Sequence, residues 1–250
     1  MSNLLLTNLR VMDPFGPIEY LENASILIRN GLIEKVTSDD LSTSFEGNSI
    51  DMAGKIVLPG MINGHTHLYS TLALGMHPPQ NQPTNFVEIL KEVWWKLDLG
   101  LDEASVKSSF KVGLIDCLRN GVTTVMDHHA SPSFVQGSLD ILAETAQELG
   151  LNISICFEVS DRNGEANFQA ELEENLRSID KYRDTPNIVP LMGLHASFTL
   201  SDTSLQLIAD RLKDHPEVGI HIHVAEDVAD ERDAQERGYE SVIQRLDHFG

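Results

Sequence analysis

The pattern of hydrophobic positions along this chain changes near residue 56. Before it, short apolar runs alternate with turns, and the runs at 24–28 and 32–36 flank Asn30-Gly31, a dipeptide typical of tight hairpins. After it, strand-like apolar runs alternate with segments of helical period. This pattern predicts a small β module over residues 1–56 and an α/β domain over residues 57–250.

The α/β part contains five predicted strand and helix pairs. We predict strands at about 57–67, 122–127, 153–159, 188–194 and 219–224, and helices at about 85–98, 102–119, 139–149, 165–179, from 202 onward, and 230–250. Such alternation is typical of parallel βα units in a (β/α)8 TIM-type barrel, whose active site lies where the strands end. A closed barrel needs about eight strands. We therefore expect only the first five βα units here, in a chain that stops early.

Composition and charge restrict the class of partner. The chain has 250 residues, 41% hydrophobic and 22% charged, which is ordinary for a soluble globular protein. Its 38 acidic and 18 basic residues give a net charge of -20, which opposes binding to nucleic acid or an anionic membrane. We find no signal peptide or transmembrane segment and expect a cytoplasmic protein. Cys117 and Cys156 lack metal-ligand spacing, so we expect reduced core residues.

Candidate metal ligands lie at the ends of two predicted strands. His65 and His67 follow an apolar run, and side chains two apart on a strand share a face, so both can approach one metal ion. The alternative is a pair of polar loop histidines. A later apolar strand carries His221 and His223, and Glu226 follows three residues after His223. The strand pattern permits either His221 or His223 as the third ligand.

These segments resemble the amidohydrolase superfamily, in its cytosine/guanine deaminase and chlorohydrolase-like branch. Residues 57–67 are similar to that family's first barrel strand and 121–127 to its second. The segment from His223 to Glu226 resembles its fifth-strand pattern, a metal histidine followed by a proton-shuttling glutamate. Trp94-Trp95 and residues 86–90, 127–131, 160–164 and 194–201 resemble SsnA-type aminohydrolases still more closely.

The resemblance implies one divalent metal ion held by three histidines and an aspartate. His65, His67 and His223 occupy the histidine positions, which favours His223 over His221, and Glu226 is the implied catalytic proton shuttle. Zinc suits a nitrogen-rich site, although Fe²⁺ or Mn²⁺ would also suit it. A further histidine on strand six and an aspartate on strand eight would lie beyond residue 250. The N-terminal module is implied to be part of a small β-sandwich completed by C-terminal strands.

Other residues have a functional and a structural interpretation. The resemblance implies that His195 and Asp98 contact substrate; the alternatives are a structural histidine and a solvated helix end. Trp94 and Trp95 would form an aromatic wall for a flat ring or would pack in the core. The run Asp127-His128-His129 would line the pocket, or Asp127 would only cap a turn. Arg162, in a polar loop, is a weaker candidate.

The implied function is hydrolytic deamination of an amino-substituted nitrogen heterocycle, such as a purine, pyrimidine or pterin, with release of ammonia. One alternative is hydrolysis of a cyclic amide or a chloro-heterocycle. Another is a non-catalytic truncated amidohydrolase fragment. Whatever the longer protein does, we expect the 250-residue chain by itself to be inactive and poorly soluble or oligomeric, because strand five would be an exposed edge. The expected partner is a small heterocyclic substrate, with no nucleic acid and no membrane, and association into a homo-oligomer is left open.

Overall fold

The computed structural model describes residues 3–16, 19–43 and 45–250. It divides into two compact units, Met1–Gly60 and Met61–Gly250, close to the change of hydrophobic pattern at residue 56. The candidate site residues all lie within the second unit.

The first unit is a five-stranded mixed sheet built around β1 (Leu4–Met12). β1 pairs antiparallel with β2 (Tyr20–Arg29) and parallel with β4 (Asn48–Asp51) and β5 (Ile56–Val57), and β2 pairs with β3 (Leu32–Thr37). The predicted hairpin turn is confirmed: Asn30 and Gly31 have φ values of 51° and 81°, as a two-residue primed turn requires. Leu9, Val11 and Ala24 belong to its small core.

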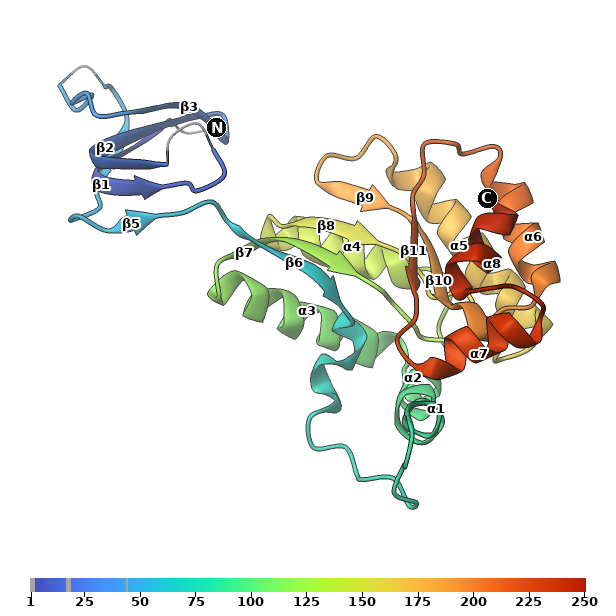
Figure 1. Cartoon of the computed structure of the whole chain (residues 1–250). Helices are drawn as coiled ribbons and strands as arrows, with labels where there is room; N and C mark the ends of the chain where they lie inside the picture. The colour runs from blue at the N-terminus through green and yellow to red at the C-terminus, as the bar shows by residue number, and fades with distance from the viewer. Residues whose placement is uncertain (1–2, 17–18, 44) are drawn as a thin grey trace. The chain divides into compact units, whose positions relative to one another are not determined.

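The second unit contains the five predicted strands, all parallel and in chain order (Figure 1). β6 (Met61–Thr66), β7 (Val122–Asp127), β8 (Asn152–Ile155) and β9 (Ile188–Pro190) form one sheet. The fourth predicted strand is interrupted at Leu191, and its second half, β10 (Met192–Ala196), pairs with β11 (Ile220–His223). A bridge between Val159 and Leu194 continues the pairing across the interruption.

Helices connect these strands. They comprise η1 (Leu68–Ala73), α1 (Phe86–Ile89), the π-helical turn η2 (Leu90–Trp94), α2 (Trp95–Gly100), α3 (Glu103–Arg119), α4 (Ser138–Leu149), α5 (Glu165–Tyr182), η3 (Ser197–Thr199), α6 (Asp202–Leu212), α7 (Val228–Glu236) and α8 (Val242–Phe249). The expectation of one helix over 230–250 is wrong. Gly238 adopts φ 93°, a left-handed conformation that ends a helix, and Ser241 caps α8. Over the described ranges, no helix is both long and apolar enough to cross a membrane.

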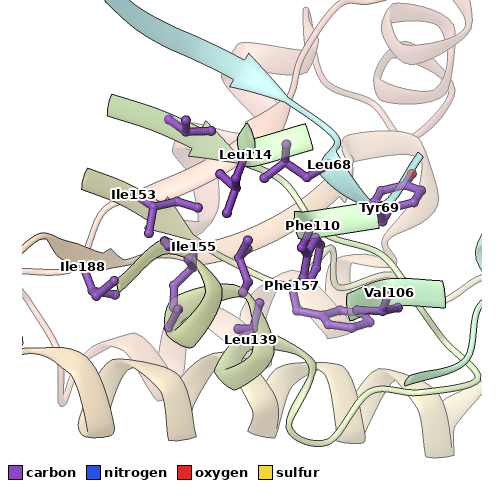
Figure 2. Packing of buried hydrophobic residues seen from close by; sticks show 14 of the residues in the cluster. Leu68, Tyr69, Val106, Phe110, Leu114, Leu139, Ile153, Ile155, Phe157 and Ile188 are labelled. Atoms are coloured by element: carbon purple, nitrogen blue, oxygen red, sulfur yellow. The ribbon is translucent and has the colours of Figure 1, made fainter. Parts of the chain in front are cut away.

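The core of the second unit lies between the sheet and its helices. Figure 2 shows Phe110 and Leu114 of α3 and Leu139 of α4 packed against Ile153 and Ile155 of β8. All five side chains are less than 2% exposed, so each buries close to its whole apolar area, roughly 1.5–3 kcal/mol apiece. This packing holds the strands rigidly, and the polar residues that follow them are held with them.

Candidate metal centre

Three predicted ligands from the first and fifth strands converge. His65 is on β6, His67 follows it, and His223 ends β11. Although β6 and β11 lie at opposite ends of the strand order, their C-terminal ends meet: Nε2 of His223 is 3.1 Å from Nε2 of His67 and 3.3 Å from Nε2 of His65. The five strands therefore curve far enough to bring the outer two together at one end.

The proton positions suit a cation between these rings. Nδ1 of His67 donates to the carbonyl of His128 at 2.8 Å, and Nδ1 of His223 donates to the carbonyl of His195 at 2.8 Å. Burial also lowers the pKa of His67 to about 4, so its ring is neutral at pH 7 and its Nε2 carries a lone pair. A lone pair on Nε2 of His223, 3.1 Å away, would repel this one unless a cation lay between them.

The spacing of the nitrogens matches a small tetrahedral ion. Ligand nitrogens about 2.0–2.1 Å from zinc stand roughly 3.3 Å apart at tetrahedral angles, and the two Nε2 separations are 3.1 and 3.3 Å. Ligand atoms of all three histidines lie within 4.8 Å of one another. The donor set therefore fits a divalent ion with at least one open coordination position.

His221, the alternative ligand, occupies a different place. Its Nε2 lies 3.1 Å from Nδ1 of His65, and its Nδ1 lies 3.8 Å from Sγ of Cys156. It therefore stands behind His65 and outside the group of three converging rings. Burial, with neighbouring histidines, lowers the pKa of His221 to about 3. The geometry favours His223 as the third ligand.

Glu226 lies beside the metal position in the turn before α7. It lines the same cavity as the three histidines, with an exposed side chain. The turn is shaped by Ala225, whose φ is 53°, and by buried Asp230, whose carboxylate accepts from the backbone N–H groups of Ala225 at 2.8 Å and Phe198 at 3.2 Å. Asp230 was not predicted, and it holds the loop that carries Glu226.

The cavity beside the histidines has a volume of about 170 Å³. Its aromatic wall comes from the helical segment 86–100: Trp94 lies 5.8 Å from the ring of His67, and Trp95 lies 6.3 Å from that of His195. The guanidinium of Arg162 stacks over Trp95 at 5.3 Å. The cavity is lined by His65, His67, Tyr69, Phe86, Leu90, Trp94, Trp95, Asp98, Glu158, Arg162, His195, His223 and Glu226.

A buried carboxylate, Glu158, organises the cavity wall and was not predicted. It accepts from Nδ1 of His128 at 3.2 Å and from Arg162 at 3.1 Å, and Nε2 of His195 lies 3.2 Å from the carboxylate. Burial by itself would raise its pKa, but His195, His128 and Arg162 outweigh that effect and hold the pKa well below its usual range. Its position just after an apolar strand was the sequence feature that could have identified it.

His195 and Asp98 both reach the cavity, and both already have partners inside the protein. Nε2 of His195 lies 3.2 Å from the carboxylate of Glu158, and its Nδ1 lies 2.9 Å from the hydroxyl of Thr199. Burial lowers the pKa of His195 to about 3. One oxygen of Asp98 accepts from Arg162 at 3.2 Å, whereas the other is buried without a partner. Burial, then Glu158, raises the pKa of Asp98 to about 7. Asp98 is 2% exposed and is not a solvated helix end.

The run Asp127-His128-His129 supports the cavity from behind. All three residues are fully buried and are absent from its lining. Asp127 accepts from the backbone N–H of Leu68 at 2.8 Å, which is the turn-capping alternative. His129 packs between aromatic rings, with Phe110 at 4.9 Å, and His128 joins Glu158 to the β11 strand.

Comparison with known proteins matches this chain to one family and to several named relatives. The amidohydrolase family model matches residues 56–249. The chain is 29% identical over 203 residues to 5-methylthioadenosine/S-adenosylhomocysteine deaminase 2 of Archaeoglobus fulgidus, covering 80% of this chain and 46% of the relative. It is 30% identical over 206 residues to 5'-deoxyadenosine deaminase of Methanothrix thermoacetophila, covering 82% and 45%. The chain spans about half the length of these relatives.

Solved structures show the same fold. An adenosine deaminase from Xanthomonas campestris with bound zinc superimposes with a TM-score of 0.79 at 19% identity, covering 100% of this chain and 55% of that one. Atrazine chlorohydrolase from Arthrobacter aurescens, complexed with zinc, gives 0.76 at 24% identity, covering 99% and 58%. Since the family match extends over most of the sequence, from Ile56 to Phe249, this chain belongs to the amidohydrolase family.

Proposed function

We propose that this chain carries the metal centre of a hydrolytic deaminase, which replaces an amino group on a nitrogen heterocycle with oxygen and releases ammonia. The observation that carries the proposal is the approach of the Nε2 atoms of His67 and His223, 3.1 Å apart beside a cavity that Glu226 also lines. Relatives named as deaminases of adenosine derivatives support it. Zinc is the proposed metal because nitrogen ligands suit it, with Fe²⁺ or Mn²⁺ as alternatives.

The proposal includes a larger domain organisation. Residues 57–250 would supply five βα units of a (β/α)8 barrel, and residues 1–56 part of a small β-sandwich. An apolar groove of about 320 Å³ beside β11, lined in part by Ile220, Ile222 and Ile243, supports this proposal because a sixth unit of the barrel would pack there. A strand-six histidine and a strand-eight aspartate would then complete the site.

Each residue has a distinct role in the proposed reaction. A divalent ion held by His65, His67 and His223 would supply the Lewis acidity that makes water nucleophilic near neutral pH. Glu226 takes one proton from the attacking water and delivers it to a ring nitrogen. The ring carbon gains a C–O bond and loses its exocyclic C–N bond, and the second proton of the attacking water passes to the leaving amino group, so that amine plus water becomes the oxo product plus ammonia.

The cavity wall would orient the ring for this attack. Trp94 and Trp95 are placed to sandwich or flank a flat aromatic substrate. Glu158 and Arg162 hold His195 and Asp98 in fixed positions, and the unpartnered oxygen of Asp98 can accept a hydrogen bond from a substrate N–H or O–H. The named relatives make an amino-purine the first substrate class to test.

The net charge of the chain restricts the class of partner. A net charge of -20 disfavours nucleic acid and anionic membranes, so a small heterocycle is the proposed partner, in a cytoplasmic protein. The proposal leaves open whether the chain associates into a homo-oligomer. Size-exclusion chromatography with light scattering would determine it.

A substrate panel tests the function. Zinc-loaded protein, as the 250-residue chain and as the longest reading frame that contains it, is incubated with adenosine derivatives, guanine, cytosine and a pterin, with ammonia as the readout. We expect ammonia without ring opening from the longer form and no turnover by the 250-residue chain alone. Chloride release from a chlorotriazine or opening of a cyclic amide, with no ammonia from any amine, would favour the alternative hydrolases. No turnover in either form would favour the non-catalytic fragment.

Replacement of Glu226 by Gln is the matched catalytic control. The amide keeps the shape of the side chain but removes the base, so Glu226→Gln should retain zinc while turnover falls by about 10² to 10⁴. Zinc content by atomic emission and kcat by ammonia release measure the two effects. Unchanged turnover with zinc in place would remove Glu226 from the mechanism.

A further inference from the structure

A line of four groups runs from His65 into the core. Nδ1 of His65 lies 3.1 Å from Nε2 of His221, Nδ1 of His221 lies 3.8 Å from Sγ of Cys156, and that sulfur lies 3.5 Å from the carbonyl oxygen of Asp127. The line passes from β6 to β11, then to the residue after β8 and to the end of β7. None of these contacts has a role in the proposed reaction.

One assignment of protons satisfies every contact in this line. The Asp127 carbonyl can only accept, so the Cys156 thiol donates to it. The sulfur then accepts from Nδ1–H of His221, which leaves Nε2 of His221 as an acceptor for Nδ1–H of His65. The Nε2 atom of His65 therefore carries its lone pair toward Nε2 of His223, 3.3 Å away.

His65 differs from the other two proposed ligands in how its ring is oriented. His67 and His223 each donate Nδ1–H to a backbone carbonyl, whereas the partner of Nδ1 in His65 is a side chain. His65 is also exposed, whereas the other two are half-buried. Its orientation therefore depends on His221 more than on the backbone.

We propose that His221 and Cys156 are positioning residues for the metal centre, which hold His65 in the tautomer and orientation that present its Nε2 lone pair to the ion. This inference rests on the proposed metal site. Partners behind a metal-binding histidine commonly set its tautomer and raise its basicity, and their loss costs about 10–100-fold in metal affinity. His221 is itself fixed from behind, because Nε2 of His128 donates to its backbone carbonyl at 3.1 Å.

The same atoms could be taken for a second metal site, because His128, Cys156 and His221 cluster within 4.8 Å. The hydrogen bonds argue against it. Nε2 of His128 donates to a carbonyl, and its Nδ1 lies 3.2 Å from the Glu158 carboxylate. An Nε2 atom that donates to a carbonyl has no lone pair for a metal ion, and Nδ1 is turned to Glu158.

Zinc affinity of the full chain, measured by competition with a chromogenic chelator, tests the proposal. His221→Phe keeps a ring but removes the acceptor, so we expect zinc affinity to fall about 10–100-fold. His221→Gln should recover most of it, since the amide oxygen can accept near the position of Nε2. Cys156→Ser should stay near wild type and Cys156→Ala should lose affinity, while His215→Phe, remote from the line, should not change it.

Nitrogen-15 NMR of the zinc-free wild-type chain gives an independent readout. We expect His65 to be protonated at Nδ1; protonation at Nε2 would overturn the proposal even if a His221 variant failed to fold. Equal zinc affinity in wild type and His221→Phe would overturn it as well. A second zinc ion per chain, lost in Cys156→Ala, would replace it with a metal site. Absence of zinc binding by wild type would instead reject the proposed metal centre.

Discussion

At the scale of single residues, the chemistry of this site depends on which group contacts the second ring nitrogen of each histidine. In His67 and His223 that nitrogen contacts a backbone carbonyl oxygen, whereas His195 and His128 each place a ring nitrogen against Glu158. The first two are left with a lone pair for a cation, and the last two serve the wall of the cavity. The same residue type therefore takes ligand and structural roles within one small volume.

Buried His129 predicts a dependence of stability on pH. Burial lowers its pKa to about 3 in the folded protein, from a usual 6.5. Between these values the unfolded chain binds one more proton than the folded chain, so stability is complete above about pH 6.5 and is lost as pH falls toward 3, by roughly 1 kcal/mol per pH unit.

His129→Gln isolates this contribution, because the amide can still donate to Ser131 but does not titrate. Urea unfolding at pH 4.5, 5.5 and 7.5 should show a steeper loss of stability in wild type than in the variant. The other groups are common to both proteins and cancel in the difference. Parallel pH profiles would show that His129 is accessible to protons in the folded state.

At the scale of elements, a helical irregularity places the aromatic wall. The segment 86–100 contains a π-helical turn at Leu90–Trp94 between α1 and α2, and such turns are common at functional sites. Trp94 and Trp95 follow each other at its end yet face different histidines, His67 and His195. The helix thus lines two parts of one cavity with adjacent residues.

Close contact between two strand regions makes Gly193 of β10 a sensitive position. A Cβ atom there would lie 2.3 Å from the backbone oxygen of Phe157, and a backbone atom cannot move aside cheaply. We expect Gly193→Ala to destabilise the protein by about 1–3 kcal/mol or more through overpacking. Gly219→Ala is the control, because its nearest contact would be a Leu191 side-chain carbon at 3.5 Å. Urea unfolding measures the free energy of unfolding of both variants, and equal values would contradict the prediction.

At the scale of the whole chain, curvature of the parallel strands creates the proposed metal centre. β6 and β11 are separated by three intervening strand positions, yet His67 and His223 touch. Each intervening strand contributes at its end: His128 after β7, Glu158 after β8 and His195 on β10. The site therefore requires the sheet to be formed and curved.

Metal binding should therefore stabilise the folded chain. An ion that binds only the folded state at a hundredfold excess over its Kd adds about 2.7 kcal/mol, which corresponds to roughly 5–10 °C in Tm for a chain of this size. We expect Zn²⁺ to raise Tm in wild type, EDTA to reverse the rise, and His223→Ala to abolish it. His215→Ala should respond as wild type does; an equal rise in His223→Ala would place the ion elsewhere.

Local pattern in the sequence determined the elements and the positions of the candidate ligands. Apolar runs located the five strands, and Asn30-Gly31 located a hairpin. The spacing of His65 and His67 at a strand end depends only on the two-residue period of a strand. These features were predictable because residues near in sequence decide them.

Tertiary structure alone decided how those residues are used. His221 and His223 share a strand face, and only the approach of β6 distinguishes the ring behind His65 from the ring beside His67. Glu158 became an organising carboxylate because His128, Arg162 and His195 arrive from three other segments. Proton positions and charge in a buried site depend on partners distant in sequence, and folding must bring those partners together before the roles exist.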